Sequence, residues 1–269
     1  QKAVIRYVST NGNQVLKTDE VTGKSGEAIA YSTTSQITEF KKQGYKLVSD
    51  EFTAGGAKVY DYDTARDQVY TVTLSERVEP VNPDNPSPQP NTPVNPGQPD
   101  SPRWPGTVEN LDNKESVSRT IHYVYEDGSK AKDDVVETLN FKRWSRINLV
   151  TGQIFFQDWT TNDDTFDKVV SPTIAGYTAD KSEIPAVSGV QAKDQDRVET
   201  VTYRKDAQKA VIRYVSTNGN RVLTTDEVTG KSGEAIAYST ASQITEFKKQ
   251  GYKLVSDEFT AGGAKVYDY

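Results

Sequence analysis

The chain contains one segment twice, and this duplication restricts its possible folds more than any other feature of the sequence. Residues 1–62 recur as residues 208–269, and the copies differ only at Gln14/Arg221, Lys17/Thr224 and Thr34/Ala241. An enzyme gains little from a second copy of its fold, whereas a binding protein gains avidity because each later contact becomes intramolecular. The duplication therefore predicts a repetitive binding or spacer protein with at least three units of about 60 to 100 residues.

The composition excludes several classes of partner and site. The net charge is −6, and Lys and Arg are scattered among Asp and Glu, which argues against nucleic acid or an anionic membrane as the main partner. The absence of cysteine excludes disulfides and thiolate metal sites, and the absence of methionine suits exposure to oxidants outside a cell. No apolar run approaches about 20 residues, and no signal peptide is recognisable. We expect an internal piece of a longer protein.

The duplicated segment has the pattern of a small α+β module. Asn11-Gly12 between two runs rich in β-branched residues predicts a hairpin. Thr33 and Gln36 resemble a capping box at the start of a helix over about 34–43. Further strands are expected at Tyr45–Ser49, Lys58–Tyr62 and Gln68–Leu74. One helix over one mixed sheet predicts a β-rich α+β fold of the ubiquitin-like β-grasp type.

Proline is concentrated in a single tract. Ten of the twelve prolines lie between Pro80 and Pro105, most of them three residues apart, which matches the period of the polyproline II helix. An extended tract of this length would reach roughly 80 Å. We expect a semi-rigid spacer, and the alternative is a proline-rich docking motif for an aromatic groove.

A related module follows the proline tract. Arg119–Tyr125 and Val198–Arg204 repeat the strand patterns of the first copy, and Trp144–Trp159 is an insertion that reads as a second hairpin around Thr151-Gly152. The predicted organisation is an elongated array of four parts: module 1–79, spacer 80–116, module 117–206 with the inserted hairpin, and module 207–269. The last module has no counterpart of Gln68–Leu74, so we expect an open gap in its sheet, left by a cut or filled by another chain.

Several phrases resemble the mucus-binding (MucBP/Mub) repeat family. In the middle module they are Ile121–Tyr125, Thr151-Gly152, Asp158-Trp159-Thr160, Ser171–Thr178 and Val201-Thr202-Tyr203, which look like the first (B1) half of such a repeat. In the duplicated copies they are Thr18–Glu27 and Gly44–Asp50, which are similar to the second (B2) half. The resemblance covers nearly everything except the proline tract.

The resemblance implies a B2, linker, B1, B2 arrangement from a surface adhesin of a Gram-positive bacterium. Such adhesins are extracellular, cell-wall-anchored rods of β-grasp domains that bind mucin glycans, and some members bind immunoglobulins. It implies a monomeric rod whose anchor and signal peptide lie outside this segment. The family supplies no signature of glycan-contacting residues.

The sequence gives no support for catalysis and little for a metal. His122 is the only histidine and occupies a predicted strand position that is Arg6 in the first copy, so we expect a solvent-facing residue and a protein that is not an enzyme. No cofactor is expected. Asp163, Asp164 and Asp167 are weak Ca²⁺ candidates, but their spacing is not that of an EF-hand, and a solvated acidic loop is the preferred interpretation.

Sugar binding requires an aromatic face beside planar polar groups. Trp144 and Trp159 bracket the inserted hairpin, and Tyr177 is a third candidate for contact with ligand. The alternative is that these rings form the core of a small module. The leading hypothesis is non-enzymatic adhesion to mucin glycoproteins through repeated weak glycan sites; the alternatives are a structural stalk and a protein-binding module, for example for immunoglobulin.

Overall fold

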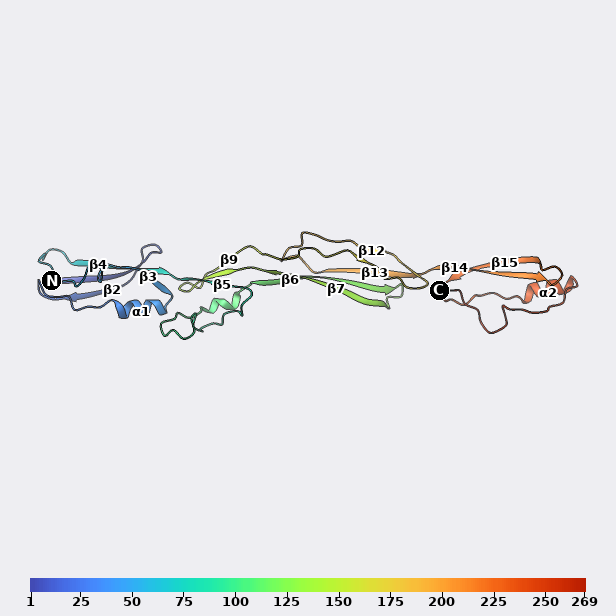
Figure 1. The fold of residues 1–269 in the computed structure, drawn as a ribbon, viewed down its shortest axis with the longest axis horizontal. Helices are drawn as coiled ribbons and strands as arrows, with labels where there is room; N and C mark the ends of the chain where they lie inside the picture. The colour runs from blue at the N-terminus through green and yellow to red at the C-terminus, as the bar shows by residue number, and fades with distance from the viewer. The chain divides into compact units, whose positions relative to one another are not determined.

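The computed structural model describes residues 1–269, which form two compact units (Figure 1). The first unit combines residues 1–116 with 140–162, and the second combines 117–139 with 163–269. Strands β6 (Lys114–Tyr125) and β7 (Lys130–Lys142) each contain residues of both units. None of the helices could serve as a membrane-spanning segment.

The first copy forms a four-stranded sheet with one helix. Its elements are β1 (Lys2–Ser9), β2 (Val15–Thr22), α1 (Thr34–Lys42), β3 (Tyr45–Asp50) and β4 (Gln68–Glu76). The order across the sheet is β2-β1-β4-β3, and the central pair β1–β4 is parallel. The hairpin, the helix and the strands over 45–49 and 68–74 are thus confirmed. The turn contains Gly12 at φ 68° and Asn13 at φ 54°, values that favour these two residue types.

Helix α1 covers one face of this sheet and buries it. Ile5, Tyr7 and Val72, all fully buried, pack with Ile37 and Phe40 of α1. The ring of Phe40 lies 5.5 Å from that of Tyr7, centroid to centroid. The helix therefore presents its two apolar residues to the two central strands, as a period of three to four residues predicts.

Two local expectations are wrong. Residues 58–62 form no strand, and this stretch makes only an isolated bridge between Ala28 and Val59. Thr33 makes no side-chain cap to α1, and its hydroxyl instead donates to the Asp50 carboxylate at 2.6 Å. A cap would require the Thr33 oxygen to accept an N–H of the first turn, whereas the structure directs this hydroxyl to a charged acceptor on β3.

The expected continuous spacer is also wrong, because the proline-rich segment folds back on itself. Asn91 N–H donates to Trp104 O, Trp104 N–H to Thr92 O, and Val94 N–H to Pro102 O, all at 2.9 Å. Pro80 lies within strand β5 (Val78–Val81). The apolar residues at the two ends of the segment explain the difference: Val81 and Trp104 join one core cluster with Ile147. Burial of these side chains opposes the extended conformation that proline spacing alone favours.

The inserted hairpin consists of β8 (Ser145–Asn148) and β9 (Ile154–Phe156) and pairs with β5. The 3₁₀ helix η1 (Gly106–Asn110) contributes Val108 to the core beneath this sheet. The hairpin around Thr151-Gly152 is confirmed. Its contacts lie with the first unit, whereas the sequence placed it in the middle module.

In the second unit a parallel pair again occupies the centre of a sheet. The order is β11-β13-β6-β7, with β11 at Tyr177–Ala179 and β13 at Arg197–Lys205, and β13 runs parallel to β6. A separate short pair joins β10 (Val169–Val170) to β12 (Glu183–Ile184). Arg119 of β6, only 1% exposed, donates to Glu137 at 2.7 Å, to Pro185 O at 3.0 Å and to Asp167 O. This one side chain ties the long connection before β13 to the sheet.

The second copy of the duplicated segment has a smaller sheet. Strands β14 (Ala207–Ser216) and β15 (Arg221–Lys231) pair as a two-stranded sheet, followed by α2 (Ala241–Lys249). Residues 252–257, equivalent to β3, form no strand, and α2 has no buried residue. Without a counterpart of β4, the edge of β14 and the apolar face of α2 lack the strand that covers them in the first copy.

The acid response of Asp257 provides a test of the local hydrogen bonds in this copy. The Thr240 hydroxyl donates to Asp257 at 2.6 Å, and with the N–H groups of Phe259 and Thr260 it lowers the pKa of the carboxyl. A carboxyl whose pKa is lower in the folded than in the unfolded state stabilises the fold at pH values above the unfolded pKa of about 3.9. This stabilisation is lost as the pH falls through the folded-state pKa. We expect Thr240→Val to raise the pKa of Asp257, measured by carboxyl ¹³C NMR, and Thr245→Val to leave it unchanged. An unaltered titration in Thr240→Val would contradict the assignment.

Candidate functional site: an exposed aromatic sheet face

The sheet β5-β8-β9 has one buried and one open face. Val81 and Ile147 point into the core beneath it. The register sets Pro80 opposite Arg146 and Arg146 opposite Phe155, so these three side chains form one row on the other face. Alternation along β5 adds Val78 to that face. We add Trp144, the exposed residue just before β8, because it precedes Arg146 by two residues and its carbonyl accepts the N–H of Gln157 just after β9 at 2.9 Å.

We call these five residues the aromatic face: Val78, Pro80, Trp144, Arg146 and Phe155. Trp144 is 43% exposed and Phe155 46% exposed, and Val78 is 41% exposed. Pro80 and Arg146 are exposed as well. A flat sheet surface with two open aromatic rings and a planar guanidinium has the components that recognise the apolar and hydroxylated faces of a sugar.

The turn of the hairpin is fixed by one buried amide. Asn148, 6% exposed, accepts the N–H groups of Val150 at 3.0 Å and Thr151 at 3.2 Å. Its side-chain N–H donates to Glu76 at 2.6 Å, which joins the turn to the end of β4. Gly152 adopts φ 74° and its carbonyl accepts the Thr107 hydroxyl at 2.7 Å. These contacts hold the C-terminal end of β8, and with it the aromatic face, to β4 and to Thr107.

A second aromatic group, which includes Phe156 on the other face of β9, contacts an arginine. The guanidinium carbon of Arg143 lies 4.0 Å from the ring centroid of Phe156 and 4.2 Å from that of Trp159. Arg143 also donates to the Asp112 carbonyl at 2.7 Å and to its carboxylate at 2.9 Å. Stacking and the ion pair fix Trp159 in place, so this ring has a structural partner while Trp144 is open to solvent.

The three sequence candidates thus fall into different environments. Trp144 belongs to the aromatic face, and Trp159 lies outside it, stacked on Arg143. Tyr177 lies in the second unit, with its ring 4.7 Å from Tyr125 and partly buried against a core cluster. Sequence reasoning missed Pro80 and Phe155; the register of β5 against β8 reveals Pro80, that of β8 against β9 reveals Phe155, and no local pattern does.

The three acidic candidates make separate local contacts. No group of three or more His, Cys, Asp or Glu side chains gathers in the structure. Asp163 accepts the Thr165 N–H at 2.9 Å and Asp164 accepts the Thr165 hydroxyl at 3.0 Å, while Asp167 provides its carbonyl to Arg119. His122, 40% exposed, contacts Asp134 at 2.9 Å on the surface of β6.

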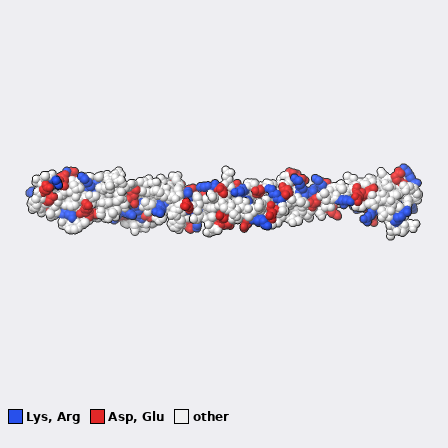
Figure 2. All heavy atoms as spheres, turned by 90° about the horizontal axis from the view of Figure 1, so that it is seen from above, with Lys and Arg blue, Asp and Glu red and all other residues white.

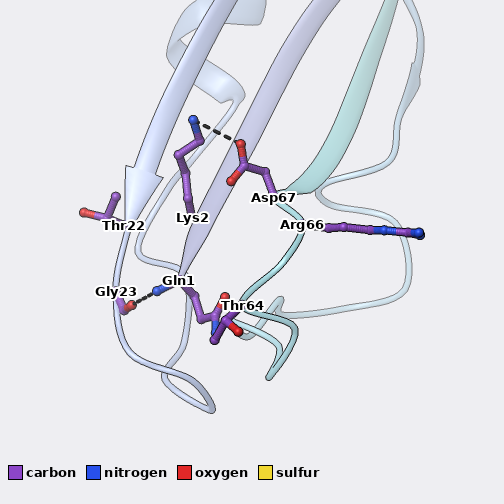
Figure 3. Close-up of a pocket in the computed structure, with 7 residues that line it drawn as sticks. All are labelled: Gln1, Lys2, Thr22, Gly23, Thr64, Arg66 and Asp67. Carbon is purple, nitrogen blue, oxygen red and sulfur yellow. Dashed lines mark hydrogen bonds and ion pairs between the residues drawn. The ribbon is translucent and has the colours of Figure 1, made fainter.

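A polar hollow at one end of the first copy is a weaker candidate (Figure 3). It is lined by Gln1, Lys2, Thr22, Gly23, Thr64, Arg66 and Asp67. Lys2 pairs with Asp67 at 3.0 Å, and the side chain of Arg66 extends away from the hollow. No aromatic ring lines it, so it lacks the surface on which a sugar would stack. The acidic and basic side chains are also interspersed over the face shown in Figure 2, without a broad area of one sign.

Comparisons with protein families and with solved structures both identify mucus-binding proteins as similar to this chain. The family model for the mucin binding domain matches residues 1–76 and 208–269, and the Muc B2-like domain model matches residues 108–207. The crystal structure of Mub-RV aligns with TM-score 0.60 at 26% identity and covers 77% of this chain and 99% of that one. The type 2 repeat of the mucus binding protein MUB from Lactobacillus reuteri aligns with TM-score 0.50 at 28% identity and covers 77% and 100%. A search of curated proteins found no match.

The matches correct one expectation. The Muc B2-like description falls on the middle module, which the sequence assigned to the B1 type, so B2 is the wrong label for the duplicated copies and the right one for the segment between them. The duplicated segment and the middle module are nevertheless both components of mucus-binding repeats. On the two family models and the similarity to solved Mub repeats, the chain belongs to the mucin binding domain family.

Proposed function

We propose that the chain is a non-enzymatic adhesion segment that binds mucin glycans through the aromatic face of the sheet β5-β8-β9. The observation that carries the proposal is the pair of open rings near Arg146: Phe155 lies opposite it on β9, and Trp144 precedes it by two residues. Apolar patches of a sugar stack on such rings, and the guanidinium donates to hydroxyl or acidic groups at the sugar edge. The family match supports mucin as the source of the glycan.

The repeat organisation supports weak, multiplied contacts. A single shallow face with two rings binds a sugar weakly, because little of the ligand is enclosed. Repeated copies on one chain convert later contacts into intramolecular ones, and mucin offers repeated glycans in return. Such a segment would act at the surface of a Gram-positive bacterium.

We also propose that the modules are of the β-grasp type. A β-hairpin, a helix and a last strand parallel to the first, at the centre of the sheet, support this for the first copy. The parallel pair β6–β13 supports it for the middle module.

Loss of either ring should weaken binding to immobilised mucin. We expect Trp144→Ala and Phe155→Ala each to reduce affinity roughly tenfold, since truncation of a contacting aromatic costs about 1–2 kcal/mol. Val136→Ala is the control, because Val136 is an exposed apolar residue outside the face, at 61%. The measurement is surface plasmon resonance on mucin before and after enzymatic removal of its glycans.

The result separates three interpretations. Binding that disappears with the glycans and weakens in both variants supports the proposal. Equal binding to deglycosylated mucin would move the recognition to protein, and unchanged binding in Trp144→Ala and Phe155→Ala would remove the aromatic face from the site.

A further inference from the structure

Two module junctions, one in each unit, are built in the same way. In the first unit, Gly44 follows α1 at φ 96° and its carbonyl accepts the N–H of Arg77 at 2.8 Å. The carbonyl of Arg77 then accepts the N–H of Leu149 at 2.9 Å. A Cβ on Gly44 would lie 2.9 Å from Leu149, so the glycine also allows close contact with the next element.

In the second unit, Gly176 makes the contacts that Gly44 makes in the first. Its φ is 74°, and its carbonyl accepts the N–H of Asp206, the residue after β13, at 2.9 Å. The carbonyl of Asp206 accepts the N–H of Ser232 at 3.0 Å. A Cβ on Gly176 would lie 2.9 Å from the Tyr269 ring and 3.0 Å from Ser232, which is fully buried.

The surface that contacts Gly176 is present a second time in the chain. We call it the N-terminal pole: Gln208, Ser232 and Tyr269 in the last copy, and Gln1, Ser25 and Tyr62 in the first. The local geometry is the same, because the side-chain amide of Gln208 donates to Ser232 at 3.3 Å and that of Gln1 to Ser25 at 3.2 Å.

The two poles differ in burial. The difference lies at the serine: Ser25 is exposed and Ser232 is 0% exposed, whereas the tyrosines of both poles are open, at 80% for Tyr62 and 72% for Tyr269. The glycines Gly44 and Gly251 also differ in their surroundings. Gly251 is equivalent to Gly44 and also has a positive φ, 91°, but a Cβ on Gly251 would have no neighbouring atom within 4 Å. These contacts therefore belong to the junctions and not to the fold of a single module.

We propose that the pole formed by Gln1, Ser25 and Tyr62 is a docking surface for the Gly176 end of another Muc B2-like module. In the docked state the Ser25 N–H donates to the carbonyl of the residue after the last strand of that module, as the Ser232 N–H does to Asp206. The docking combines backbone groups and a bare glycine with one exposed ion pair, Lys205–Glu234 at 3.5 Å, and Glu27 is the equivalent of Glu234 in the first copy. Each added repeat would therefore join the previous one in a fixed orientation.

The test uses a longer chain in which residues 1–207 precede the full 269-residue sequence. Because the protein has no cysteine, spin labels can be placed at single engineered sites. The reference pair is Val198→Cys with Val222→Cys in the original chain. The test pair is Val198→Cys in the added repeat with Val15→Cys in the following one; all three valines are more than half exposed. We expect electron-spin distance distributions with the same centre and width for both pairs.

Glycine variants show whether the docking causes that distance. Gly176→Val in the added repeat should broaden the distribution of the test pair at least twofold. Gly251→Val is the matched control, since it introduces the same backbone strain at a glycine without a contact, and it should change nothing. A broad test-pair distribution before any glycine substitution, or one that Gly176→Val leaves unchanged, would overturn the proposal. Neither result depends on mucin binding.

Discussion

Replacement of Arg119 by alanine is expected to destabilise the attachment of residues 163–190 to the middle sheet by about 3 kcal/mol. The guanidinium is buried, and it is the common partner of Glu137 and of the carbonyls of Asp167 and Pro185. It also lies 5.2 Å from the centroid of the Phe166 ring, which is fully buried. The variant leaves two carbonyls and a carboxylate without their donor and opens a cavity beside Phe166.

Hydrogen exchange can measure this effect where it occurs. Amide exchange in residues 163–190 should accelerate roughly hundredfold, because about 3 kcal/mol corresponds to two decades in an opening equilibrium. Arg6→Ala provides the control, as Arg6 is an exposed arginine on the first strand of another module. Acceleration spread evenly over the whole chain, or none in this segment, would be inconsistent with a local anchoring role.

Phe40→Ala should cost about 3–4 kcal/mol, whereas Phe247→Ala, the same substitution in the other copy, should cost about 1 kcal/mol. Phe40 is 5% exposed, and α2 contains no buried residue although its sequence differs from that of α1 only at the first position. The rings neighbouring each phenylalanine are equivalent, at 5.5 Å for Tyr7 and 5.6 Å for Tyr214. The difference between the two losses of unfolding free energy therefore measures the stabilisation that β3 and β4 add in the first copy.

The chain Gln1–Tyr269 contains its own control for this comparison. Hydrogen exchange of β1 should respond strongly to Phe40→Ala, and that of β14 weakly to Phe247→Ala. Peptides that span Gln14 or Arg221 distinguish the two copies. Equal responses would mean that burial by β4 does not account for the stability of the helix on its sheet.

Local patterns predicted the elements whose partners are close in sequence. Asn11-Gly12 identified the first hairpin, and the spacing of Ile37 and Phe40 identified α1. The patterns failed at Lys58–Tyr62 and in the proline tract, where tertiary contacts decide. Pro80 cannot donate a hydrogen bond, yet it occupies β5 opposite Arg146, because an edge strand does not need every donor.

The candidate site shows the same limit. The sequence selected Trp144 and Trp159 because they bracket an insertion, and the structure places one on an open sheet face and the other on Arg143. Phe155 joins Trp144 only through the pairing of β8 with β9, and Pro80 only through pairing across more than 60 residues of sequence. The hydrophobic period and the composition of a segment do not show which residues of a distant strand it will pair with.

The first unit is discontinuous in sequence, and this affects the order in which it can be completed. Val78–Val81 pairs with Ser145–Asn148, so β5 has no partner until the chain beyond residue 148 is present. A chain that emerges from the ribosome or crosses an export channel N-terminus first must hold β5 and Trp104 unpaired while residues 117–139 pass. A fragment cut at residue 116 would stay in that state, with an unpaired strand that favours aggregation.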